Sequence, residues 1–194
     1  YHPLERFTTD EIIPSEIDNY FRCQELTGYV HDMSCAMLGG VSGHAGLFSD
    51  AEDLAILMQM LVNGGTYGGR RYLSESVVKD FTKCQFCAPN GAGNRRGLGW
   101  DKPMRGKGGP TCECVSYASF GHTGFTGTMA WADPDQEVVY IFLSNRIYPN
   151  ANSNKLLEMG IRTQVQEVVH GAVAARIIAT PAAPVNVLVP IAPR

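Results

Sequence analysis

The pattern of apolar and polar residues predicts a helix in the first half of the chain. Apolar residues recur there at steps of three and four: Leu54, Leu57, Met58 and Leu61. This spacing places them on one face of a helix. A capping-box pattern, with Ser49 and Glu52 as its two side chains, precedes the helix, and Asn63-Gly64-Gly65 ends it. A second, shorter helix is predicted from Ser74 to Thr82.

The best-defined β region lies between residues 120 and 145. Thr126–Ala132 is rich in Thr, Met and Trp, and Val138–Leu143 is an unbroken apolar run, as in a strand covered on both faces. The residues between them, Asp133-Pro134-Asp135-Gln136, form a short turn. Two strands joined by a short turn predict an antiparallel hairpin.

Apolar residues return at helical spacing near the end of the chain: Leu156, Leu157, Ile161, Val165, Val168, Val169 and Val173. They predict one long amphipathic helix, capped near Asn152–Asn154, whose apolar stripe lies on the sheet. His170 falls on this helix, and we expect it at the surface. Residues 1–178 are predicted to form one domain, and the Pro-, Ala- and Val-rich residues 179–194 a tail or linker.

The remaining segments are dominated by turn-forming residues. Residues 1–27 are predicted to be irregular, with a short extended piece at Ile12–Glu16, and the Gly-rich residues 36–48 a close-packed connection. Residues 84–118 are predicted to be a long loop region with isolated strand pieces. Its cations are Arg95, Arg96, Lys102, Arg105 and Lys107. They suit either a solvated loop or a rim that attracts an anionic substrate.

Composition excludes some classes of protein. The chain has 194 residues, of which 44% are hydrophobic and 18% charged, so a packed core is expected rather than disorder. A net charge of −3 gives no electrostatic basis for nucleic-acid binding. No apolar run approaches the length that spans a bilayer.

Six cysteines raise the question of a metal site: Cys23, Cys35, Cys84, Cys87, Cys112 and Cys114. Two close pairs, Cys84-x-x-Cys87 and Cys112-x-Cys114, can in principle supply four zinc ligands. The second pair has a single intervening residue, and a long Gly-rich loop separates the two pairs. Free thiols or disulfides therefore fit this spacing better than zinc.

The segment Gly121–Thr128 carries the most chemically useful groups. His122 can be neutral or charged near neutral pH, and the hydroxyls of Thr123 and Thr126 can bind a carboxylate or carbonyl. Gly124 has no side chain, so a ligand can approach the backbone there. Alone, a histidine on a strand is more often structural than functional.

Three segments in order make the chain resemble the β-lactamase and penicillin-binding-protein family, especially its class C and esterase-like branches. His122-Thr123-Gly124 resembles the Lys-Thr-Gly or His-Thr-Gly triplet on the strand that lines the family's active site. Leu143–Asn150 is similar to its end-of-strand signature, and Gly39–Ser49 to the segment before its capped helix. The resemblance covers residues 1 to about 178. It implies an α+β fold of the α/β sandwich type, in which helices cover an antiparallel sheet.

The resemblance also implies acyl transfer, in which a Ser-x-x-Lys serine attacks an amide or ester such as a cell-wall peptide or β-lactam. His122 would polarise the site, and Thr123 would bind the acidic group of the substrate, next to Gly124 and Thr126. The backbone N–H of Phe125 would be half of an oxyanion hole. Asn145 is a second candidate for the anionic group. No cofactor is implied.

Two motifs of the family occur out of order. Ser76-Val77-Val78-Lys79 lies in a predicted surface helix, although the family places its nucleophile well before the Gly-rich segment. Tyr148-Pro149-Asn150 matches Tyr-x-Asn but follows the His-Thr-Gly triplet instead of preceding it. We therefore interpret both as chance matches and assign no nucleophile to this chain.

This interpretation carries further expectations. The chain starts at Tyr1 with no signal pattern, so an N-terminal portion with the nucleophile is expected upstream, and the 194 residues alone are expected to be inactive. Without that portion, the edge of Val138–Leu143 would be uncovered and the chain would self-associate. The resemblance implies export to the periplasm or cell surface.

Three alternatives remain open from the sequence. The same fold can bind cell-wall peptide or glycan without hydrolysis, as a non-catalytic module. A zinc-stabilised structural domain is another. His31-Asp32 and His44 can form a small metal or proton-relay site, although histidines in Gly-rich connections often only bond backbone groups.

Overall fold

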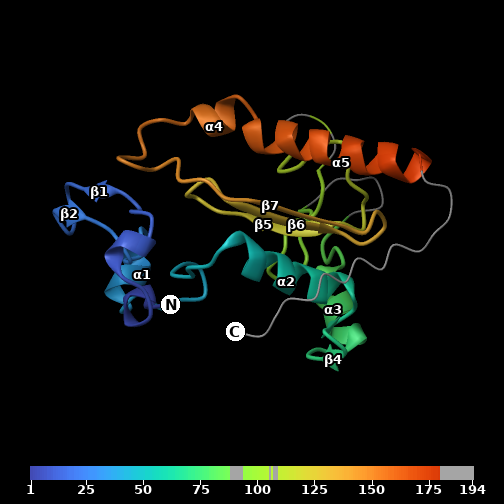
Figure 1. The fold of residues 1–194 in the computed structure, drawn as a ribbon, viewed down its shortest axis with the longest axis horizontal. Coiled ribbons are helices and arrows are strands. Elements are labelled where there is room, and N and C mark those ends of the chain that lie inside the picture. The colour runs from blue at the N-terminus through green and yellow to red at the C-terminus, as the bar shows by residue number, and fades with distance from the viewer. Residues whose placement is uncertain (88–93, 105, 107–108, 180–194) are drawn as a thin grey trace.

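The computed structural model describes residues 1–87, 94–104, 106 and 109–179. Its centre is a three-stranded antiparallel sheet of β5 (Phe120–Thr123), β6 (Met129–Asp133) and β7 (Val138–Phe142), in that order. Helix α2 (Ala51–Val62) crosses one face, and α5 (Ile161–Ala179) lies over the other (Figure 1). The expected α+β fold, with an antiparallel sheet covered by helices, is confirmed.

The other elements are short and lie around this centre. Beside the ends of the strands, the N-terminal segment forms its own small group with α1 (Figure 1). These elements are the 3-10 turns Pro3–Glu5 and Thr9–Glu11, β1 (Ile17–Asp18), β2 (Gln24–Glu25), α1 (Met33–Met37), β3 (Thr66–Tyr67), β4 (Arg70–Arg71), α3 (Glu75–Thr82) and α4 (Lys155–Glu158). None of the helices described is long and apolar enough to cross a membrane.

The predicted hairpin is present, with a later start than expected. β6 pairs with β7 so that Trp131 faces Tyr140 and Asp133 faces Val138, and residues 134–137 form the turn between the strands. β6 begins at Met129 rather than Thr126, because hydrogen bonds close the preceding residues into a turn. In that turn the Gly124 N–H donates to the Thr128 carbonyl (2.8 Å) and the Gly127 N–H to the Gly124 carbonyl (3.0 Å).

The first predicted helix is present as α2, with different capping and a different buried face. Asp50 is the N-cap residue: its Oδ1 accepts the backbone N–H of Asp53 at 2.8 Å, so the capping pair predicted from Ser49 and Glu52 is wrong. The helix buries Met58, Met60 and Leu61 against the sheet, and Leu57 is exposed. Helix α3 starts after Ser74, as predicted, and the Ser74 hydroxyl caps it.

The predicted long C-terminal helix is two helices. Gly160, with φ of +62°, separates α4 from α5, and Asn154 makes no side-chain cap. The predicted apolar stripe is buried only in part: Leu157, Val165 and Val168 are exposed, whereas Val169 packs against the core cluster that contains Trp131 and Tyr140. Residues 180–194 lie outside the described residues, so the predicted tail stays a prediction.

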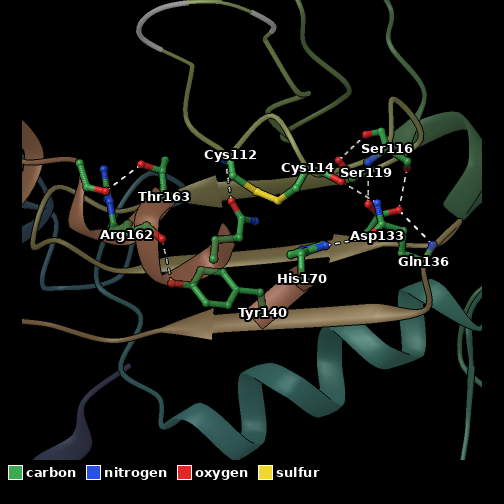
Figure 2. The surroundings of a disulfide bond; sticks show 12 residues. Cys112, Cys114, Ser116, Ser119, Asp133, Gln136, Tyr140, Arg162, Thr163 and His170 are labelled. Carbon is green, nitrogen blue, oxygen red and sulfur yellow. Dashed lines mark hydrogen bonds between the residues drawn. A yellow bond between two sulfur atoms is a disulfide. The ribbon is translucent and has the colours of Figure 1, made fainter. Parts of the chain in front are cut away.

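Polar side chains occupy the buried face of α5. His170 is only 3% exposed, so the expectation that it lies at the surface is wrong. Its Nδ1 lies 2.8 Å from Oε1 of Gln136, and Gln166 Oε1 accepts the Cys112 N–H at 3.0 Å (Figure 2). The segment beneath α5 is irregular, so its backbone groups need side-chain partners that an apolar stripe cannot supply.

The paired cysteines form disulfides instead of a zinc site. Cys84 is bonded to Cys87 and Cys112 to Cys114, while Cys23 and Cys35 are free thiols. Each bond closes within its own motif, which leaves no thiolates for a shared ion. In the described part of the chain, no group of three or more His, Cys, Asp or Glu residues is arranged to hold a metal.

The described cations of residues 84–118 each have a partner within the loop region. Lys102 is 4% exposed and donates to the Ala118 carbonyl at 2.8 Å. Arg96 pairs with Asp101, and Arg95 donates to the Pro103 carbonyl. Arg105 and Lys107 lie outside the described residues. The cations that are described therefore stabilise the loop from within.

The N-terminal segment is more ordered than the sequence predicts. Buried Asp18 accepts backbone N–H bonds from Tyr20, Phe21 and Arg22 and a bond from the Arg22 guanidinium. Burial alone would raise the pKa of Asp18, but these donors hold it well below its usual range. The Gly-rich connection is close-packed as predicted: a side chain on Gly46 (φ +100°) would overlap the Gly40 carbonyl.

Candidate active site

The His-Thr-Gly triplet lies at the accessible end of β5. His122 is exposed, Thr123 and Gly124 are half-buried, and the imidazole Nδ1 lies 2.8 Å from the Thr123 carbonyl oxygen. The strand register places His122 opposite Ala130. The triplet is therefore outside the core, where a ligand can reach it.

Gly124 has a structural role that the sequence did not reveal. A Cβ atom at this position would overlap Oγ1 of Thr128, so the missing side chain lets the two arms of the turn approach each other. The expected role of Gly124 toward a ligand stays a prediction.

Phe125 is exposed, and its ring contacts two segments that are distant in the sequence. Among the described residues, the Phe125 N–H has no hydrogen-bond acceptor. The ring stacks on His31 at a centroid distance of 5.1 Å, and the Arg146 guanidinium carbon lies 4.5 Å from its centroid. A fixed ring next to an unengaged N–H suits a backbone donor for a ligand oxygen.

Thr126 and Asn145 are brought close to this turn. The Thr126 carbonyl accepts the backbone N–H of Arg146 at 3.0 Å. The Asn145 side-chain nitrogen donates to the Pro14 carbonyl, and Oδ1 is buried with no partner in the described part of the chain. As placed here, the Asn145 amide holds the N-terminal segment, and its expected role toward an anionic group stays a prediction.

The out-of-order motifs lie elsewhere. Ser76 and Lys79 are exposed on α3, and the Ser76 hydroxyl lies 3.1 Å from that of Ser74. Val78 of the same helix joins the core cluster that contains Phe120, at the start of β5, whereas the triplet is at its end. The Tyr148 hydroxyl donates to Glu25 at 3.2 Å, and this bond raises the pKa of Tyr148.

His31 and His44 each pair with a different carboxylate. His31 Nε2 lies 3.2 Å from Oε2 of Glu16, whereas His44 Nε2 lies 3.0 Å from Oδ1 of Asp32. The Ser34 hydroxyl and the Cys35 N–H also donate to Asp32, and these bonds, with His44, hold the pKa of Asp32 well below its usual range. His31, Asp32 and His44 therefore do not form one site.

Two cavities lie away from the triplet. One of 410 Å³ is bounded by N-terminal residues, among them Arg22, Tyr29 and Phe48. The other, of 330 Å³, lies between Pro110 and the α4–α5 junction. The triplet lines neither cavity. Within the described residues the triplet lies on an open surface. Other residues would be needed to enclose a substrate there.

Comparisons with known proteins agree with the resemblance. A sequence model of the family described as "Beta-lactamase" matches residues 7–159. A putative D-alanyl-D-alanine carboxypeptidase of Salmonella enteritidis PT4 is 41% identical over 166 residues, which are 78% of this chain and 37% of that protein. Its counterpart in Salmonella schwarzengrund is 37% identical with the same coverage. This chain thus spans little more than a third of these relatives.

Among solved structures, the chain is similar to a β-lactamase (Mb2281c) from Mycobacterium bovis. The TM-score is 0.46 with 23% identity, over 75% of this chain and 52% of that one. Because the family match spans most of the chain, from before β1 to the end of α4, this chain belongs to the serine β-lactamase and penicillin-binding-protein family.

Proposed function

We propose that these residues form the substrate-binding and oxyanion-stabilising wall of a serine acyl-transfer hydrolase whose nucleophile lies outside the 194 residues. The observation that carries the proposal is the accessible end of β5. There the Phe125 N–H, which has no acceptor among the described residues, follows the imidazole of His122 and the hydroxyl of Thr123.

The chemistry needs donors in this arrangement. When a serine attacks a carbonyl, negative charge develops on the carbonyl oxygen, and a fixed N–H directed at it lowers the barrier by about 3–4 kcal/mol. The Phe125 N–H fills that role in the proposal. The Thr123 hydroxyl would bind the acidic group of the substrate, and His122 would add positive potential when protonated.

The substrate class follows from the relatives. Two of them carry the name D-alanyl-D-alanine carboxypeptidase, so we propose that the acyl donor is a cell-wall peptide ending in D-Ala-D-Ala. Its terminal carboxylate is the anionic group that Thr123 would bind. Cell-wall peptide lies outside the cytoplasmic membrane, so the proposal includes a location in the periplasm or at the cell surface.

A non-catalytic cell-wall-binding module is the second candidate. Its supporting observation is that Ser76 and Lys79, the serine and lysine of the chain's Ser-x-x-Lys match, are exposed on α3, which packs at the start of β5. A parent protein with no Ser-x-x-Lys ahead of these residues would favour this candidate.

The first test uses the 194-residue chain. We expect no turnover of nitrocefin or p-nitrophenyl acetate, because a donor wall without its nucleophile does not form an acyl-enzyme. Ser76→Ala should behave in the same way. Turnover by the chain that disappears in Ser76→Ala would show that our interpretation of Ser76 is wrong.

The second test uses a longer protein with Ser-x-x-Lys ahead of these residues. Thr123→Val should lower kcat/KM for a D-Ala-D-Ala peptide by about 10–100-fold, because the substrate carboxylate loses a charge-assisted hydrogen bond. Thr66→Val on β3 is the matched control and should retain activity. An unaffected Thr123→Val enzyme would exclude Thr123 from substrate binding.

A further inference from the structure

The Phe125 ring is held by residues that are distant in the sequence. His31 precedes α1 and Arg146 follows β7, yet both contact this one ring. Phe125 itself is 60% exposed, so burial does not fix it. It lies in the turn between Gly124 and Gly127, where glycine gives the backbone rotational freedom. The ring contacts therefore add to the hydrogen bonds that close this turn, and they further restrict the peptide that carries the Phe125 N–H.

His31 is in turn fixed at both its ring and its backbone. The ring pairs with Glu16, which is only 4% exposed. The Arg22 guanidinium donates to the His31 carbonyl at 2.8 Å and to the Val30 carbonyl at 2.6 Å, and Asp18 anchors Arg22. A connected set of polar contacts thus runs from the buried Asp18 to the ring stacked on Phe125.

Glu16 depends on this contact. Its second oxygen, Oε1, is buried with no partner among the described residues, so the side-chain contact of this carboxylate is made through Oε2, to His31. A buried carboxylate with half of its acceptor capacity unused is costly unless the remaining contact is strong. The pair therefore favours an imidazole that stays directed at Glu16, which also sets the plane on which Phe125 stacks.

The geometry points to Glu16 and His31 as positioning residues that set the direction of the Phe125 N–H. This inference rests on the proposed function, in which that N–H meets the developing oxyanion. Neither residue touches the substrate in this scheme. Glu16 orients His31, His31 orients the Phe125 ring, and the ring limits rotation of the peptide that carries the donor.

The test reads the Phe125 amide directly, in the ¹⁵N-labelled 194-residue chain. The charged groups around His31 are Glu16, Arg22, Asp32 and, across the Phe125 ring, Arg146. We expect Glu16→Gln and His31→Asn each to move the Phe125 amide signal, because each removes a contact that fixes the Phe125 ring.

The matched control is His44→Asn, which removes the other histidine–carboxylate pair and should leave the Phe125 amide signal in place. The β5 and β6 amides report whether each variant is folded. Should His31→Asn unfold, His31→Phe keeps a ring at the position but loses the contact with Glu16, and it should move the Phe125 amide signal as well. A Phe125 amide signal that is unchanged in the folded variants overturns the inference.

Activity separates this inference from the function on which it rests. In a longer protein that carries the nucleophile, Glu16→Gln should lower kcat about 10–100-fold with little change in KM, because the oxyanion donor is misdirected while binding is retained. An active protein with unchanged kcat in this variant contradicts the positioning role. A longer protein with no acyl transfer even as wild type contradicts the proposed function, and the amide signal then decides the coupling by itself.

Discussion

At the scale of single residues, Lys102 shows how tertiary contacts change a side chain that looks ordinary in the sequence. In the sequence it is one of several cations and suggests a solvated loop residue. In the structure it is buried over the Phe120 ring, with the ammonium 5.9 Å from the ring centroid. Burial and the nearby Arg95 lower the pKa of Lys102 to about 8, against the opposing effect of Asp133 and Asp135. The folded state therefore holds this proton less tightly than the unfolded chain.

This shift predicts a pH dependence of stability. Between about pH 8 and pH 10.5 the unfolded chain binds more protons at Lys102, so the free energy of unfolding rises with pH, by about 1–2 kcal/mol after allowance for solvent screening. Lys102→Met should remove this rise. Urea unfolding at pH 8 and pH 10 checks it, with Lys83→Met, an exposed lysine, as control. A rise of equal size in Lys102→Met would exclude Lys102 as its source.

At the scale of elements, α5 is attached to the molecule by polar contacts. His170 contacts Gln136, whose side-chain nitrogen donates to the Cys114 carbonyl at 2.7 Å, and Gln166 accepts the N–H of Cys112 (Figure 2). The helix is therefore tied by hydrogen bonds to both the β6–β7 turn and the disulfide-bonded segment. An apolar stripe could slide along a sheet, whereas these bonds define one register.

Protonation of His170 should weaken this attachment. Burial lowers the pKa of His170, against the effect of Asp133, so the stability it contributes is present above the unfolded value of about 6.5 and is lost as the pH falls below it. His170→Gln keeps a hydrogen-bonding group and should lose the acid sensitivity. His170→Leu leaves Gln136 without this partner and should cost about 1–3 kcal/mol at pH 7.

Urea unfolding of the three proteins at pH 7 and pH 5.5 measures both effects. Asp133 is common to all of them, so the difference between wild type and His170→Gln isolates the imidazole. A wild-type protein that is equally stable at both pH values while His170→Gln is not would contradict this account of α5.

At the scale of the whole molecule, the sheet has an open side. Among the described residues β7 pairs with β6 alone, so its outer edge presents unpaired backbone groups. Large apolar side chains are also exposed on the neighbouring helices, with Val168 at 73% and Met159 at 59% exposure. An open edge next to exposed apolar residues favours pairing with a second chain.

We therefore expect the 194-residue chain to self-associate at micromolar to millimolar concentration, with a mass by light scattering that grows as concentration rises. Val168→Lys on α5 should reduce this association, because it replaces an exposed apolar side chain with a charge. Glu167→Lys, an exposed polar neighbour, is the control for charge. A monomer at all concentrations would show that neither the strand edge nor the exposed apolar side chains drive association.

What the sequence determined by itself is local. The β6–β7 hairpin, the start of α3 at Ser74 and the end of α2 near Asn63 each depend on a few consecutive residues, and each was predictable from them. The order of three separate motifs was enough to indicate the family. The His122–Phe125 segment was singled out by its chemical groups and by its resemblance to the family's triplet, whereas the turn that follows Thr123 was not predicted.

Tertiary structure decided which face of each helix is buried and which side chains meet. Helical periodicity marks apolar positions, but besides the sheet α5 meets the irregular segment at Cys112 and the β6–β7 turn at Gln136, and there Gln166 and His170 are the buried residues. The contact of His31 with Phe125 joins residues 94 positions apart, and Glu16 reaches it only after the N-terminal segment folds back. Local sequence patterns carry no information about contacts between such distant residues. The energy of these contacts depends on neighbours that only the fold brings together.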